Sequence, residues 1–135
     1  MIAAVCGWHE HHEAAATAIE ERLAKGDRIA AAAPALVESY AVLTRLPAPH
    51  RLAPADAWAL LEANFVSASD VVALGAPEYV ALVKAAVSQG IHGGRTYDAV
   101  IAACAQKASA GEFLTLNRRH FDHLSGDTAV VDPTA

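Results

Sequence analysis

The order of apolar and polar positions along the chain predicts helices separated by short strands. From about His11 to Lys25, alanine, isoleucine and leucine recur at helical spacing, and Gly26 ends the segment. Pro34 suits the first turn of a second helix that runs to Leu46. The same criteria predict helices from Pro54 to about Phe65, from Glu78 to Gln89, from Thr96 as the cap through YDAVIAACAQKASA, and a helical turn from Arg118 to Leu124.

Four short apolar runs lie between these helices and are predicted to be strands. They are Arg28–Ala33, Asp70–Leu74, Glu112–Leu116 and Ala129–Val131. Strands that alternate with helices favour an α/β fold with a parallel sheet covered on both faces, where sites lie beyond the carboxyl ends of the strands. The segment before the first helix is typical of the end of a helix or of a βα connection. We expect a single domain over residues 1–135.

Composition narrows the classes of protein that fit this pattern. Cys6 and Cys104 are too few for a disulfide framework or a zinc cluster, so we expect buried thiols in a reducing compartment. The chain has no apolar run of membrane-spanning length and no basic secretory leader, which favours a cytoplasmic protein. A net charge of −5 excludes general nucleic-acid binding by a basic surface, so any such role must be local.

Asp98 lies in the first turn of the helix predicted after Gly93. A carboxylate at this position is stabilised by the helix macrodipole and needs no other role. The glycine pair before the helix, however, lets a ligand or loop approach closely. We expect one face of this helix to be buried, namely the row Tyr97, Ile101, Cys104 and Ala108.

Two further polar residues follow predicted strands. Glu38 lies one turn into its helix, on the side that periodicity assigns to solvent, shortly after the end of a strand. Asn117 directly follows the strand FLTL, where it would face a crevice or serve as an ordinary turn or cap residue. Glu38, Asp98 and Asn117 therefore all fall at the edge of the sheet where active sites gather.

Four segments together carry a family resemblance. They are AAVCGWHEHHEAA, VESYAVLTRLP, RTYDAVIAACA and FLTLNRRHF. In this order and spacing they resemble the PIN-domain family, most closely its VapC-like toxins. The resemblance implies a three-layer α/β/α domain with a central parallel sheet, and a ribonuclease that uses Mg²⁺ or Mn²⁺ held by Glu38, Asp98 and Asn117. It also implies a type II toxin, a VapB-like antitoxin, an RNA substrate and a homodimer.

The chain departs from the family at two positions. The family's opening strand and its aspartate are absent ahead of MIAAV, and Asn117 stands where aspartate is common. An amide oxygen can still ligate a hard cation but brings no charge. One alternative is therefore a catalytically impaired PIN-like module that binds an antitoxin or a dimer partner without cleaving RNA. Another is that translation starts upstream of Met1.

Other polar groups have weaker candidate roles. The cluster His9–Glu13 lacks the H-E-x-x-H spacing of a zinc site, so a solvated cluster at a helix start is the favoured interpretation. Asp122 is a candidate outer contact of the metal or its water. The cations near the proposed cleft are candidate phosphate contacts, with an ordinary polar turn as the alternative: Arg95, Arg118 and Arg119, beside His120.

Overall fold

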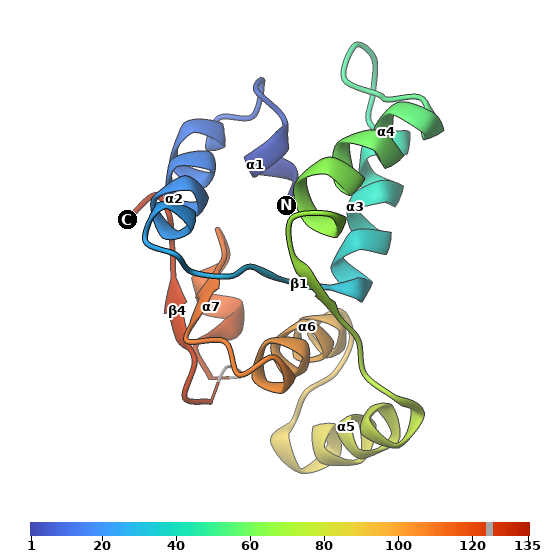
Figure 1. The fold of residues 1–135 in the computed structure, drawn as a ribbon. Helices are drawn as coiled ribbons and strands as arrows, with labels where there is room; N and C mark the ends of the chain where they lie inside the picture. The colour runs from blue at the N-terminus through green and yellow to red at the C-terminus, as the bar shows by residue number, and fades with distance from the viewer. Residues whose placement is uncertain (124–125) are drawn as a thin grey trace. The chain divides into compact units, whose positions relative to one another are not determined.

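A computed structural model describes residues 1–123 and 126–135, which divide into two compact units (Figure 1). Unit 1 comprises Met1–Val71 with Thr134, and unit 2 comprises Val72–Pro133 with Ala135. Helices and short strands alternate along both units, which confirms the α/β class. The expectation of a single domain over the whole chain stays a prediction.

Unit 1 is a group of helices beside a short pair of strands. Helix α1 packs against α2, and α3 packs against α4 and follows β1 directly. Strand β1 pairs with β2, and a proline in the first turn of both α3 and α4 sets the starting backbone angle. The bounds are α1 Ile2–Val5, α2 His12–Ala24, β1 Ala30–Ala32, α3 Ala33–Arg45, α4 Pro54–Leu61, a π-helical turn η1 Glu62–Val66, and β2 Asp70–Val72.

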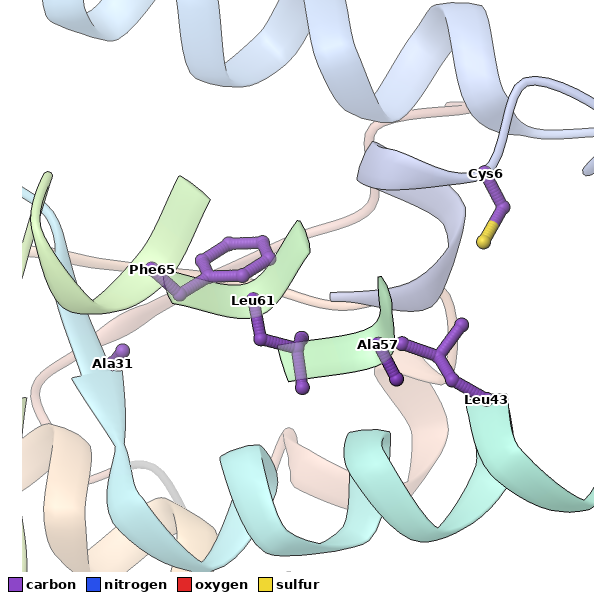
Figure 2. Packing of buried hydrophobic residues seen from close by; sticks show 6 residues of the cluster. All are labelled: Cys6, Ala31, Leu43, Ala57, Leu61 and Phe65. Carbon is purple, nitrogen blue, oxygen red and sulfur yellow. The ribbon is translucent and has the colours of Figure 1, made fainter. Parts of the chain in front are cut away.

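The core of unit 1 is built from a few large side chains among alanines (Figure 2). Leu43 of α3 is fully buried, and Leu61 and Phe65 reach the same cluster from α4 and η1. Ala31 and Ala57 complete it with Cys6, at positions where a larger side chain would not fit closely packed helices. This cluster fixes the helix that carries Glu38.

Unit 2 pairs two long helices with a two-stranded parallel ladder. Its elements are α5 Ala76–Gln89, α6 Arg95–Lys107, β3 Glu112–Leu114, α7 Arg118–Phe121 and β4 Ala129–Val131. Helix α5 lies beside α6, and α7 contacts both α6 and β4 (Figure 1). In the ladder, Phe113 of β3 is opposite Val130 of β4. Gly90 ends α5 in the left-handed conformation, with φ of 65°.

Both ends of helix α6 are fixed within unit 2. Its first residue follows Gly93, which has φ of 59°, and Gly94, which occupies the N-cap position. Near its other end, the Lys107 ammonium group donates to the Ala73 carbonyl at 2.9 Å and to the Glu78 carboxylate at 2.8 Å. The same carboxylate accepts the backbone N–H of Gly75 at 2.6 Å. One carboxylate thus joins the start of α5 to the end of α6.

Most predicted elements are confirmed, and three expectations are refined or corrected. Across the described ranges the strands pair two and two, β1 with β2 and β3 with β4. Thr96 is not the cap of α6, because the helix already begins at Arg95 after Gly94. Tyr97 is 74% exposed, and the buried residues of α6 are Ala99, Ala102 and Cys104. The predicted end of the last helical turn, Leu124, lies outside the described residues.

Within the same ranges, the helices are all too short or too polar to cross a bilayer.

Candidate functional site

Asp98 is held in the first turn of α6 and has a partner from another element. Its side chain is 27% exposed, so one part of the carboxylate reaches solvent while the rest is covered. Its Oδ2 lies 3.3 Å from Nδ1 of His120, which belongs to α7. An ion pair forms here when His120 is protonated. Asp98 is therefore partly exposed and lies within ion-pair distance of a side chain from another helix.

Helix α7 brings His120 to this carboxylate, and Asn117 begins that helix. Asn117 occupies the N-cap position, but its side chain makes no capping hydrogen bond. Its backbone N–H donates to Thr115 Oγ1 at 3.0 Å, and its carbonyl accepts the N–H of His120 at 2.9 Å. The turn is thus ordered by its backbone, which leaves the exposed amide of Asn117 available as a ligand.

The cations predicted to contact phosphate are largely engaged inside unit 2. Arg118 Nε donates to Asp122 Oδ1 at 3.2 Å, a pair one helical turn apart. Arg95 Nη2 lies 3.0 Å from His123 Nε2. Both pairs are exposed, so neither contributes much to stability or holds its arginine tightly. Asp122, predicted as an outer contact of a metal, is in this structure the partner of Arg118.

Glu38 belongs to unit 1, and its side chain is exposed on α3, as its periodicity predicts. Its neighbour Ser39 is buried and donates to the sulfur of Met1 at 3.5 Å. Burial lowers the pKa of the Met1 amino group, while the charges of Cys6 and Glu38 oppose that shift. The Met1 amino group thus lies within electrostatic range of the Glu38 carboxylate.

The oxygen donors of unit 2 fit a hard divalent cation. Asp98 supplies a carboxylate and Asn117 an amide oxygen, the two donor types that Mg²⁺ accepts while keeping several waters. Throughout residues 1–123 and 126–135, histidine, cysteine, aspartate and glutamate form no group of three that could hold a metal. The donor types, a carboxylate and an amide oxygen, are those of a hard cation rather than of a structural zinc site.

The histidine cluster near the start of the chain is ordered by local contacts. His12 begins α2, as predicted for a helix start, and its Nδ1 lies 2.9 Å from the Ala3 carbonyl. His9 Nδ1 accepts the backbone N–H of His11 at 3.1 Å. These contacts use Nδ1 of both rings and order the chain where α2 begins.

Both cysteines are free and buried, as predicted. Burial raises the pKa of the Cys6 thiol and of the Cys104 thiol above the ordinary value, which disfavours the reactive thiolate. Each thiol therefore packs as a small hydrophobic group.

Two contacts of the structure have no signal in the sequence. The spacing of His120 beside the arginines does not indicate its contact with Asp98. Trp8 stacks on His50 with ring centroids 4.2 Å apart, although 41 residues separate them in sequence. Both contacts join residues distant in sequence, so no local pattern could find them.

Comparisons with known proteins agree over most of the chain. A family model described as PIN domain matches residues 1–127. Ribonuclease VapC40 of Mycobacterium tuberculosis is 39% identical over 119 residues, which are 88% of this chain and 82% of the relative. Ribonuclease VapC27 of the same organism is 37% identical over 120 residues, which are 89% of this chain and 74% of the relative. No solved structure matches significantly.

Proposed function

The chain belongs to the PIN-domain family, and from this premise we propose that it is a metal-dependent endoribonuclease and the toxin of a type II toxin–antitoxin pair. Relatives that carry the name ribonuclease support the activity. The observation that carries the assignment to this chain is Asp98, an accessible carboxylate at the start of α6 within a matched segment. The reaction is hydrolysis of an RNA phosphodiester bond.

The proposed metal ligands are Asp98, Asn117 and Glu38. Mg²⁺ or Mn²⁺, when bound, lowers the pKa of an attacking water and offsets the charge that builds on the phosphate. Asp98 provides the negative charge in unit 2, and its second oxygen is oriented by His120. Asn117 adds a neutral oxygen. The role of Glu38 is proposed from its position in the segment VESYAVLTRLP alone.

Arg118, Arg119 and Arg95 are proposed to position the phosphate backbone. Arg118 and Arg95 already hold their guanidinium groups beside Asp122 and His123. Arginine forks match phosphate oxygens in geometry as well as charge, so these residues can orient RNA locally although the chain is acidic.

We propose a VapB-like antitoxin as the partner, a homodimer as the assembly and the cytoplasm as the location. The names of the relatives support the class of partner. Light scattering of the purified protein tests the dimer. Co-purification with the product of an adjacent small gene tests the partner.

One feature of the chain favours the alternative, a PIN-like module that binds its partner without cutting RNA. Asn117 brings no charge to the proposed metal site, which weakens affinity for a divalent cation. Titration calorimetry with Mn²⁺ separates the two functions. Binding of the partner without binding of millimolar metal would establish the alternative.

The test of the nuclease is RNA cleavage by the purified chain with Mn²⁺. Asp98→Ala should lower the cleavage rate at least about 100-fold, because it removes the charge proposed to hold the metal. Glu38→Gln should also lower the cleavage rate, by less than Asp98→Ala does. The matched control is Asp56→Ala. Asp56 also lies in the first turn of a helix, α4, but it is not one of the proposed metal ligands. Equal rates for Asp98→Ala and Asp56→Ala would refute the assignment of the site.

A further inference from the structure

Trp8 presents an indole ring to solvent within an ordered row of aromatic rings in unit 1. It is 46% exposed although His50 stacks on it, at 4.2 Å and with 25° between the ring planes. The centroid of the His9 ring lies 5.9 Å from that of the Trp8 ring, and the centroid of the His11 ring lies 5.7 Å from that of His9. These four rings, here called the ring row, come from two loops distant in sequence. One loop contributes Trp8, His9 and His11, and the other contributes His50.

Hydrogen bonds hold both loops in place before any ligand arrives. In the first, the N–H of His9 donates to the carbonyl of buried Cys6 at 2.9 Å. In the second, the N–H of His50 donates to the Pro47 carbonyl at 3.1 Å, and that of Leu52 donates to the Leu43 carbonyl at 3.0 Å. Because Cys6 and Leu43 both belong to the core, the ring row is tied to it from both sides.

A cation directly follows the last residue of the ring row in sequence. Arg51 follows His50 and is exposed, and its Nε donates to the Leu46 carbonyl at 2.8 Å. This bond uses Nε of the guanidinium group, and the two terminal nitrogens take no part in it. Planar rings with a neighbouring guanidinium form the combination that binds a base and its phosphate together.

From this arrangement we infer that the ring row is a stacking site for the bases of single-stranded RNA, built from residues other than the proposed metal ligands. The inference rests on the proposed function, since it names the form of RNA that the nuclease holds. Bases in a duplex already stack on one another, whereas unpaired bases offer a free face to an aromatic ring. Stacking also suits a chain of net charge −5, because the contribution of the stacked base itself does not depend on attracting phosphates.

Trp58 provides a matched control within the same unit. It is 49% exposed, almost the same as Trp8, and lies on α4. Among the described residues it has no aromatic ring contact of the kind that Trp8 makes. A single-tryptophan pair therefore separates the ring row from the general behaviour of an exposed indole: Trp58→Phe leaves Trp8 as the reporter, and Trp8→Phe leaves Trp58.

The experiment is fluorescence titration of both variants with oligoadenylate, with a chelator present to prevent cleavage. A stacked adenine should quench Trp8 saturably and leave Trp58 unchanged, and a duplex of equal length should quench neither. Trp8→Ala should raise the Kd about 5- to 100-fold at low and high salt alike, while Trp8→Phe, which keeps a ring, should raise it less. Circular dichroism of each variant verifies its fold.

Equal quenching of the two tryptophans, or an unchanged Kd in Trp8→Ala, would overturn the inference. Its failure is distinguishable from that of the nuclease. If the wild-type chain cuts RNA in an Asp98-dependent way while Trp8 is not quenched, only the ring row is refuted. If Trp8 is quenched while no RNA is cut, the stacking site stands and the nuclease is refuted.

Discussion

Glu38 and Asp98 are both acidic residues of matched segments, but their helices hold them differently. Glu38 is exposed on α3, and across the described chain it accepts no hydrogen bond. Asp98 is 27% exposed on α6 and lies against His120. Glu38 is thus positioned mainly by the backbone of α3, whereas Asp98 also has a neighbouring side chain within ion-pair distance. Orientation by a second residue is the usual way in which a ligating carboxylate is fixed.

The largest expected effect comes from removing the residue that anchors α3. Leu43→Ala should lower the free energy of unfolding by about 2–5 kcal/mol, because Leu43 is fully buried and its loss leaves a cavity. Chemical denaturation followed by circular dichroism measures the change. Val37→Ala is the control on the same helix, since Val37 is 72% exposed and should change stability by only about 0.5 kcal/mol. Equal losses in the two variants would show that α3 is not anchored at Leu43.

A smaller effect is expected from removing the partner of Asp98. His120 Nδ1 lies 3.3 Å from Oδ2 of Asp98, and a neighbour that orients a ligating carboxylate raises its affinity for a metal. His120→Ala should therefore bind Mn²⁺ about tenfold more weakly than the wild type. Titration calorimetry measures both affinities.

The control for this prediction is His92→Ala. His92 is exposed in unit 2, and its ring nitrogen lies 3.1 Å from the Gly90 carbonyl rather than near a carboxylate. Its replacement should leave the Mn²⁺ affinity unchanged. The same Mn²⁺ affinity in His120→Ala and the wild type would mean that the contact with Asp98 does not influence the metal.

The smallest effect concerns the far end of α6. The hydrogen bond from Lys107, then that from Gly75, lowers the pKa of Glu78. A depressed carboxyl pKa stabilises the folded state above the unfolded pKa, and this contribution is lost as pH falls through the folded pKa. Glu78→Gln should thus show a shallower loss of thermal stability on acidification than the wild type. Glu20→Gln, at an exposed position of α2, should retain the wild-type slope.

The sequence predicts where most helices and strands lie because proline and glycine mark their ends. Pro34 and Pro54 begin α3 and α4 within a residue or two, and Gly90 ends α5. The pairing of the strands cannot be predicted in this way, because a short apolar run carries no information about which strand lies beside it. The sequence could therefore predict the α/β class but not the two-by-two ladders.

Helix α6 shows why the buried face was only partly predictable. The spacing of apolar residues predicts Tyr97 on the buried face, because a large aromatic ring dominates any measure of amphipathicity. The buried face instead contains Ala99 and Ala102, whose small side chains add little to that measure yet allow close packing. Asp98 was correctly placed in the first turn, since that depends only on the start of the helix. Its contact with His120 is tertiary and had no local signal.

The π-helical turn η1 explains how Phe65 reaches the core of unit 1. Positions 57, 61 and 65 are four apart, and a row with that spacing drifts around an α-helix, whose turn holds about 3.6 residues. The N–H of Ser67 donates to the Glu62 carbonyl at 2.9 Å, a five-residue step that widens the last turn and reverses the drift. The number of residues between Leu61 and Phe65 is therefore fixed, because adding or deleting one would rotate the phenyl ring away from Leu61. A natural variant with a length change here would have to rebuild this part of the core around a different residue.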